Sequence, residues 1–468
     1  MNENVTQKQN PWFGILPLYI TASVMMLTLM ISNPVMPYIT SDFGLTASAT
    51  VWNTTLYTIS AAILAPLIGW LSDAKGLKFG IVVSLTLYTL ATFFSGFAPN
   101  FTVFLICRFF QGFGTAALIP GIMAYVNMYF PKAKRVSSLA IMTACTNIGN
   151  GIGPLVSGSL TAIFSWRQLF LGAGVLMAVV LVIDIVVVKL PAPSGDAKKP
   201  LDFAGMIALI VGISCFVTCL SMTSTYPWGS MVNIALLAVS VIFLIFFYIY
   251  EKKKNAPLMD VSLLSNKGFM LPTILRIGQI AIQTFVATAM SYFIIMGLGY
   301  SATVTGAWAT TYFLLVFPFS FLVGKINKKV KAKFMIIFGI LTWAVGIFIL
   351  SIATPELPVA LLFVAAAIMA LGNAIIPPVT TATSLSYTPA EKSGSASGTI
   401  MLLSNLASPI VSAIVIPYLS TIGAIDGMPN YALSIPFMSR IMLIFCVVIL
   451  VIALIYPANK QTETAQNK

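Results

Sequence analysis

The chain has 468 residues, of which 59% are hydrophobic and 8% are charged, whereas about 25% of the residues in a soluble domain carry charge. This composition excludes a water-soluble globule and predicts an all-α polytopic membrane protein, because one membrane-crossing helix needs about 20 apolar residues. The chain has no histidine, which excludes His-dependent nucleophilic triads and most zinc sites. We therefore expect no metal and no other cofactor.

Fourteen apolar stretches are long enough to cross a bilayer. The first is too long for a signal-peptide core and lacks a small-residue cleavage site, so it is predicted to be a helix of the mature protein. The approximate limits of the fourteen, in chain order, are 13–38, 49–72, 78–97, 101–128, 136–163, 168–189, 203–223, 231–250, 267–296, 302–324, 333–353, 357–385, 394–422 and 433–456.

The basic residues predict the orientation. Nearly all of the 25 lysines and arginines lie in loops on the side of the two termini, as in the run from Lys252 to Lys254. The positive-inside rule then places both termini in the cytoplasm. We expect the chain to lie in a plasma membrane, the cytoplasmic membrane of a bacterium. We interpret the basic loops as topology signals that contact the lipid bilayer, and not as a surface that binds nucleic acid.

A weak internal repeat predicts the domain organisation, with chance similarity between apolar segments as the alternative. A real repeat predicts a six-helix bundle at 1–190, an inserted helix pair at 191–257 and a second six-helix bundle at 258–468. Such parallel repeats place a substrate site near the bilayer midplane. A shift of 258 residues superposes Gly114, Pro120 and Asn147 on Gly372, Pro378 and Asn405, and a shift of 255 superposes Gly69 and Lys78 on Gly324 and Lys333.

The stretch from Gly69 to Lys78, Gly-Trp-Leu-Ser-Asp-Ala-Lys-Gly-Leu-Lys, lies between the second and third spans. It resembles the loop signature of the major facilitator superfamily. The resemblance implies that Gly69 allows close helix packing and that Asp73 faces a helix N-terminus in the other half, where an anion is stabilised by about 0.3–1 kcal/mol. Gly76 and Lys78 complete the motif, whereas two of its basic positions are Ala74 and Leu77 here.

Two further motifs narrow the resemblance. The run Arg108-Phe-Phe-Gln111-Gly resembles a superfamily signature that is associated with proton coupling. In span 5, Gly149, Gly153, Pro154 and Gly158 resemble the antiporter signature of drug:proton exchangers; ordinary glycine-mediated packing is the alternative for these residues. With these motifs and fourteen predicted spans, the chain resembles the fourteen-spanner drug:proton antiporter family.

One position departs from that family. Its members usually carry an acid in span 1, and alignment on Asn33 and Pro37 puts Thr28 at this position. A proton could instead use Asp42, Asp73 or a carboxylate of the substrate, or there could be no proton coupling.

Four charged residues lie inside the predicted spans: Arg108, Asp184, Arg276 and Arg440. A lipid-facing charge at mid-bilayer costs about 2.5–3.5 kcal/mol even on a lenient scale, so such residues normally face a cavity or a partner. The resemblance places spans 6 and 14 at the periphery, which makes Asp184 and Arg440 poor cavity candidates. We expect Asp184 to pair locally or to point to the interface near Lys189.

Polar side chains at helical spacing supply the candidates for substrate binding and proton coupling. Interhelical hydrogen bonding is the alternative reading of these stripes. The candidates at such spacing are Arg108, Gln111, Thr115, Asn147, Asn150, Arg276, Gln279, Gln283 and Asn405, and the resemblance adds Asn33 of the span 1 motif.

The resemblance places spans 4 and 9, which carry Arg108 and Arg276, along the central cavity. Two arginines there without a carboxylate would make an electropositive chamber, which favours neutral or anionic amphipathic substrates over cations. The sequence thus predicts a monomeric secondary transporter that exports small amphipathic molecules by alternating access, with protons as the coupling ion. The alternatives are a dedicated exporter or facilitator of an anionic metabolite or siderophore-like compound, and a membrane enzyme or lipid-remodelling protein. The enzyme is disfavoured because the spans hold no histidine and no carboxylate pair.

Overall fold

The computed structural model describes residues 11–45, 51–160, 163–188, 202–222, 226–254, 261–300, 302–327, 329–354, 356, 358–389, 392–408, 410–411, 414–415 and 431–455. Helices are the regular elements throughout these residues. Eleven of the described helices are long and apolar enough to cross a membrane, and a shorter apolar stretch, Ala204–Leu220, lies within the helix Phe203–Met222. The predicted all-helical membrane fold is confirmed, while the count of fourteen spans stays a prediction.

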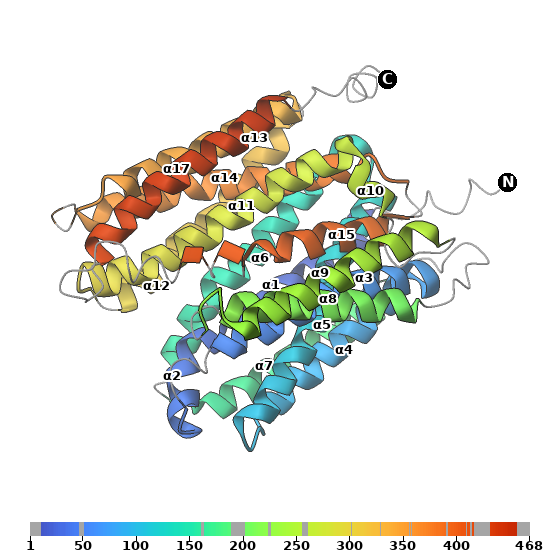
Figure 1. The fold of residues 1–468 in the computed structure, drawn as a ribbon, viewed down its shortest axis with the longest axis horizontal. Helices are drawn as coiled ribbons and strands as arrows, with labels where there is room; N and C mark the ends of the chain where they lie inside the picture. The colour runs from blue at the N-terminus through green and yellow to red at the C-terminus, as the bar shows by residue number, and fades with distance from the viewer. Residues whose placement is uncertain are drawn as a thin grey trace.

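The helices of the first part of the chain form one group (Figure 1). Within it, α5 packs against α3 and α4, and α1 packs against α6 and α7. The helices are α1 (Pro11–Met30), α2 (Ser32–Asp42), α3 (Val51–Lys75), α4 (Leu77–Ser95), α5 (Phe101–Tyr129), α6 (Lys132–Leu160) and α7 (Trp166–Val187).

A helix pair follows this group. The helices α8 (Phe203–Met222) and α9 (Met231–Lys253) pack against each other, and α8 also packs against α3. Most residues of α9 are exposed.

The last part of the chain forms a second group (Figure 1). Within it, α13 packs against α14 and α17, and α11 packs against α14. The elements are α10 (Ser262–Ser265), α11 (Lys267–Tyr292), the π-helical turn η2 (Phe293–Gly297), α12 (Ala302–Ile326), α13 (Ala332–Ser351), α14 (Val359–Leu385), α15 (Ser393–Asn405) and α17 (Tyr431–Ile455).

Residues that the repeat pairs in sequence make matching contacts in the two groups. Lys78 Nζ, at the start of α4, donates to Ile185 O at 2.7 Å near the end of α7. Lys333 Nζ, at the start of α13, likewise donates to Leu454 O at 2.6 Å near the end of α17. Each lysine therefore ties the first turn of one helix to the last turn of another. A parallel repeat would produce this pair of contacts.

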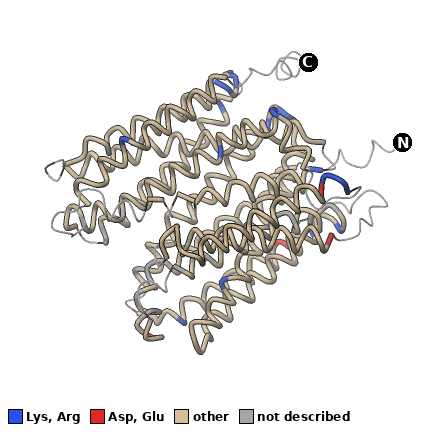
Figure 2. Tube along the Cα trace, viewed as in Figure 1, with Lys and Arg blue, Asp and Glu red and all other residues tan. Residues whose placement is uncertain are grey.

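Most lysines and arginines gather at one end of the helices (Figure 2). Lys75, Lys253 and Lys325 lie in the last turns of α3, α9 and α12 at this end, which we name the basic end. A few blue positions also lie singly along the helices, away from this crowded end (Figure 2). This separation is the pattern that the positive-inside rule uses.

At the basic end an ion pair joins the two helices of the pair α8–α9. Lys254 Nζ lies 2.7 Å from Asp202 Oδ1, which also accepts a hydrogen bond from the Gly205 N–H at 2.9 Å. Burial alone would raise the pKa of Asp202, but these hydrogen bonds outweigh burial and hold that pKa below its ordinary value. The hydrogen bond to Asp202 raises the pKa of Lys254.

These shifts predict how the stability of the pair depends on pH. The contribution of Asp202 is present above about pH 4 and is lost as the pH falls through its lowered pKa, whereas that of Lys254 is lost only as the pH rises above about 10.4. Lys254→Met should therefore lower the Tm in detergent by about 2 °C between pH 5 and 9, and by nothing measurable near pH 2. Lys252→Met, at an exposed neighbouring position, is the control. A loss of the same size at both pH values would contradict the ion-pair account.

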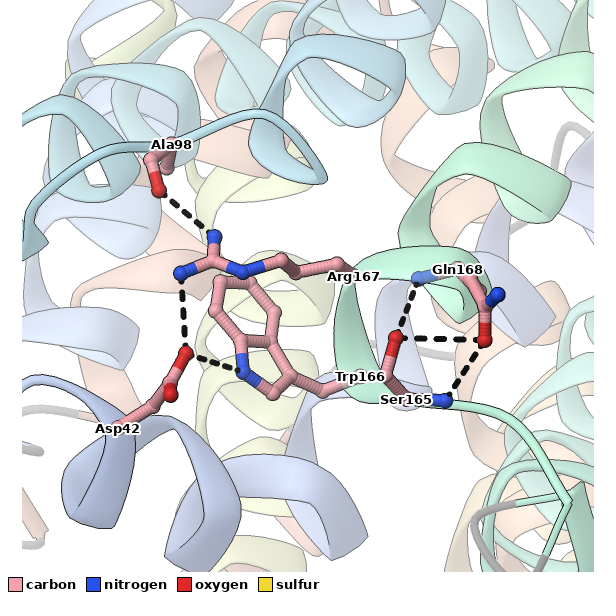
Figure 3. Close-up of polar contacts among 6 residues, drawn as sticks. All are labelled: Asp42, Ala98, Ser165, Trp166, Arg167 and Gln168. Carbon is pink, nitrogen blue, oxygen red and sulfur yellow. Dashed lines mark hydrogen bonds and ion pairs between the residues drawn. The ribbon is translucent and has the colours of Figure 1, made fainter.

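At the opposite end, Asp42 and Arg167 together tie three segments of the first group to one another (Figure 3). Asp42 Oδ2, at the end of α2, accepts from Arg167 Nη2 at 2.9 Å and from Trp166 Nε1 at 3.1 Å. Arg167 Nη1 donates to Ala98 O at 2.7 Å, and a capping box of Ser165 and Gln168 begins α7. The Asp42 and Arg167 side chains are 47% and 36% exposed, so this ion pair contributes about 0–1 kcal/mol and mainly fixes geometry.

Candidate functional site

The two groups contact each other most extensively between α3 and α15, α6 and α12, α6 and α14, and α5 and α15. At the basic end the contacts are close. A Cβ added to Gly69 of α3 would lie 2.9 Å from Gly394 O of α15, so only glycine allows this approach. Ser137 Oγ of α6 donates to Gly324 O of α12 at 3.2 Å. The basic end between the groups is thus packed backbone against backbone.

A buried asparagine makes a further contact between the groups at the basic end. Asn127 Nδ2 of α5 donates to Ser393 Oγ of α15 at 2.6 Å. Arg135 donates to both the Asn127 side-chain oxygen and the Asn127 backbone oxygen, and to Phe130 O at 3.1 Å. Because Arg135 occupies the amide oxygen, the amide NH₂ points to Ser393. We did not predict these three residues; an amide at the end of an apolar span was the available signal.

A chain of side-chain amides crosses between the groups midway along the helices. Gln279 Nε2 of α11 donates to Gln283 Oε1 at 2.9 Å and to Asn373 Oδ1 of α14 at 3.2 Å. Asn373 Nδ2 donates to Asn147 Oδ1 of α6 at 3.3 Å, and Asn147 Nδ2 donates to Thr143 O at 2.7 Å. Three predicted candidates therefore meet through Asn373, which we did not predict.

This chain leads to a prediction about stability. If the amides of Asn147 and Asn373 are direct partners, a double-mutant cycle with leucine at both positions should give a coupling of about 0.6 kcal/mol, the average for hydrogen bonds between membrane helices. The measurement is thermal unfolding in detergent. The pair Asn150 and Asn373 serves as the control cycle and should show no coupling. Equal coupling in both cycles would contradict a direct bond.

Arg108 lies inside the first group and is 2% exposed. Its Nε donates to Asn53 Oδ1 of α3 at 2.6 Å and its Nη1 donates to Gln111 Oε1 at 2.8 Å. Gln111 Nε2 in turn donates to Thr92 Oγ1 of α4 at 3.1 Å. The guanidinium also lies 5.5 Å from the centroid of the Phe104 ring. Within the described residues Arg108 has no ion pair with a carboxylate.

Arg276 lies inside the second group and is 8% exposed. Its Nη1 donates to Thr381 Oγ1 at 2.9 Å and to Pro377 O at 3.3 Å, both of α14. In the part of the chain that the structure describes, no carboxylate pairs with this arginine either. Each group thus encloses one arginine that is held by neutral oxygen atoms.

Hydroxyl groups occupy the position where an acid was expected. Thr28 Oγ1 lies 2.8 Å from Tyr88 OH, and Tyr88 OH donates to Met25 O at 3.1 Å. Tyr57 OH donates to Thr115 Oγ1 at 3.0 Å, so Thr115, which shares a face of α5 with Arg108 and Gln111, also has a partner. Thr28 borders a largely apolar pocket of about 350 Å³ between α1, α6 and α7.

The span 5 motif packs α6 against α1. A Cβ on Gly149 would collide with Ser23 O, and a Cβ on Gly153 would lie 2.8 Å from Leu27 O. Pro154 lies in the same helix, one residue beyond Gly153. The motif therefore makes a close backbone contact inside the first group; the packing of Gly158 lies outside what the structure describes.

The remaining candidates are placed as follows. Gly76 separates α3 from α4 with φ of 99°, a conformation that favours glycine. Asn150 and Asn405 are half-buried in α6 and at the end of α15. The side chains of Asn33 and Asp73 lie outside the described residues, although their backbones belong to α2 and α3.

Known proteins resemble this chain in sequence. Residues 18–281 and 273–468 each match the family model of the Major Facilitator Superfamily. The chain is 26% identical over 391 residues to the multidrug resistance protein Stp of Mycobacterium tuberculosis, covering 82% of this chain and 71% of that protein. It is 24% identical over 418 residues to the multidrug export protein EmrB of Haemophilus influenzae, covering 87% and 81%.

Solved structures share the fold. The human organic anion transporter MFSD10 superposes with a TM-score of 0.69 at 11% identity, covering 95% of this chain and 100% of that chain. The proton:xylose symporter XylE gives a TM-score of 0.68 at 14% identity, covering 95% and 96%. The repeated helix packing, the contact between the two groups and the match of both halves lead to one conclusion: the chain belongs to the Major Facilitator Superfamily.

Proposed function

We propose that the chain is a secondary active transporter that exports small amphipathic compounds, of the multidrug type, by alternating access. The names of the relatives Stp and EmrB support the class of substrate and the direction of transport. The observation that carries the proposal is the amide chain from Gln279 through Asn373 to Asn147, which joins the two groups midway along the helices. In this fold a substrate site between two rocking bundles lies at that level.

The proposed architecture has fourteen spans, with bundles at 1–190 and 258–468 and the inserted pair at 191–257. Both termini lie in the cytoplasm, because the positive-inside rule assigns the basic end to that side. The contacts of Gly69 with Gly394 and of Asn127 with Ser393 then close the cytoplasmic side. The working unit is a monomer in a lipid bilayer, and protons are the coupling ion.

The proposed substrates are neutral or anionic. Arg108 and Arg276 are buried without a carboxylate partner among the described residues, so each group carries a positive charge that neutral oxygens solvate and do not cancel. In a medium of low dielectric constant such charges act over many ångströms. They repel a cation between the groups and attract an anion.

Transport in proteoliposomes tests this proposal. We expect purified protein to accumulate the anionic dye carboxyfluorescein or a neutral amphipathic dye against its gradient, at least ten-fold faster than the cation ethidium. Liposomes without protein give the background. Flux of every compound at background level would overturn the proposal, and a preference for ethidium would overturn the electrostatic part alone.

A second candidate, a dedicated exporter or facilitator of an anionic metabolite, is favoured by the same two arginines. It differs in selectivity and in driving force. A screen in which one anion alone raises the Tm would favour a dedicated transporter, because a compound that binds only the folded state stabilises it. Flux that is indifferent to pH gradient and membrane potential would indicate a facilitator.

A further inference from the structure

One acid lies buried inside the first group, away from the arginines. Asp184 is close to the basic end of α7 and is 1% exposed. Its Oδ2 accepts a hydrogen bond from Thr21 Oγ1 of α1 at 2.6 Å, and its Oδ1 has no hydrogen-bond partner within the described residues. This partner lies on another helix, 163 residues away in the chain. The expected neighbour Lys189 lies outside the described residues.

The groups that face Asp184 decide whether its charge is balanced. From α1 the facing group is the neutral Thr21 hydroxyl. The helix α4 contributes Lys78, whose Nζ donates to Ile185 O, one residue beyond Asp184 on α7. The other charged residue that the structure describes on α7, Arg167, binds Asp42 at the far end. With no ion pair within the described residues, an ionised Asp184 would be costly in the bilayer.

The Thr21 hydroxyl can serve both protonation states of this acid. It has one hydrogen and two acceptors in reach, Asp184 Oδ2 at 2.6 Å and Pro17 O at 3.1 Å. When Asp184 is ionised, Thr21 donates to its carboxylate. When Asp184 is protonated, the acid can donate to Thr21 Oγ1, and Thr21 then donates to Pro17 O. Neither state leaves the hydroxyl unsatisfied.

Further helix contacts lie between Asp184 and the interface of the two groups. The helix α1 that carries Thr21 packs backbone to backbone on α6 at Gly149 and Gly153. The helix α6 in turn contacts α12 and α14 of the second group. Two helix interfaces, α1 on α6 and α6 on the second group, therefore lie between this site and the contact between the groups.

We propose that Asp184 is the proton-binding site of the transporter, and that α7 supplies to α1 the acid that α1 lacks at Thr28. This inference rests on the proposed function. In the step, the O–H bond of the Asp184 acid breaks, its electron pair stays on the carboxylate, and the proton passes to water at the basic end. Lys78, one helix away, is the cation placed to approach the carboxylate that forms.

The test separates proton coupling from transport itself. Reconstituted protein is assayed for counterflow, in which labelled substrate exchanges for unlabelled substrate without net proton movement, and for accumulation driven by a pH gradient. We expect Asp184→Asn to keep counterflow within about two-fold of the wild type and to lose pH-driven accumulation by at least ten-fold. Asp42→Asn, which changes an exposed acid at the opposite end, should keep both.

Each negative result contradicts a different proposal. Absence of counterflow in the wild type would overturn the proposed function. Wild-type counterflow with no response to a pH gradient, or an Asp184→Asn variant that keeps pH-driven accumulation, would overturn the proton site and leave the transporter standing. Loss of accumulation in Asp42→Asn alone would move the site to Asp42.

A second pair of variants covers the case in which Asp184→Asn does not fold. Thr21→Val removes the hydroxyl that stabilises the carboxylate, so the midpoint of the pH dependence of export should shift to higher pH. Thr21→Ser keeps the hydroxyl and should restore the wild-type midpoint. A purely structural role would change the rate or the Tm of both variants without moving the midpoint, and this result would also overturn the proposal.

Discussion

Replacing Arg108 with alanine should reduce export by at least ten-fold and lower the stability by about 3 kcal/mol. The guanidinium makes two hydrogen bonds, to Asn53 and Gln111, and hydrogen bonds to a charged group contribute about 1.5–3 kcal/mol each. Alanine takes away the donor to the amide oxygens of Asn53 and Gln111 and removes one of the two buried positive charges. Export from proteoliposomes and the Tm in detergent are the measurements.

Two further variants define what Arg108 does. Arg108→Lys keeps the charge but cannot make the same two bonds, so it should retain the preference for anions while losing part of the stability. Arg440→Ala, at an exposed arginine inside α17, should export normally. If Arg108→Ala exported like the wild type with an unchanged preference for anions, the electropositive chamber would be refuted.

Replacing Gly69 with valine should open the basic end. The atoms that a new side chain would meet are Gly394 O at 2.9 Å and Gly394 C at 3.2 Å, and backbone atoms cannot turn aside as a side chain can. Overpacking typically costs about 1–3 kcal/mol. A bias of that size shifts a two-state equilibrium by roughly 5- to 150-fold. We expect a wider distance between spin labels at Lys75 and Lys329, and at least ten-fold slower export.

Gly306 provides the matched control for this experiment. A Cβ there meets nothing within 4 Å, and the residue lies in α12 of the second group. Gly306→Val should leave both the label distance and the export rate close to the wild type. An unchanged label distance in Gly69→Val would show that this contact does not hold the basic end closed.

Local spacing predicted contacts within single helices well. Arg108 and Gln111, three residues apart, and Gln279 and Gln283, four apart, were expected on shared faces, and each pair is hydrogen-bonded. The all-helical membrane fold was equally accessible, because the bilayer imposes long apolar runs whatever the tertiary contacts.

Contacts between helices could not be predicted in the same way. Asn373 is a single amide in an apolar run, and its partner Asn147 lies 226 residues away. Asp184 looked peripheral because its helix is peripheral in the family, yet its side chain turns inward to Thr21. Helical periodicity fixes the face of a residue relative to its own helix, but not which neighbour that face meets.

Because most of α9 is exposed, we expect turnover to depend on the thickness of the surrounding membrane. The pair α8–α9 is held to the first group through the packing of α8 on α3, the helix that also closes on Gly394. When α3 tilts, the pair α8–α9 must move with it through the surrounding lipid. Hydrophobic mismatch costs fractions of a kcal/mol per ångström, so turnover should vary with acyl-chain length, and shortening the pair should flatten that dependence.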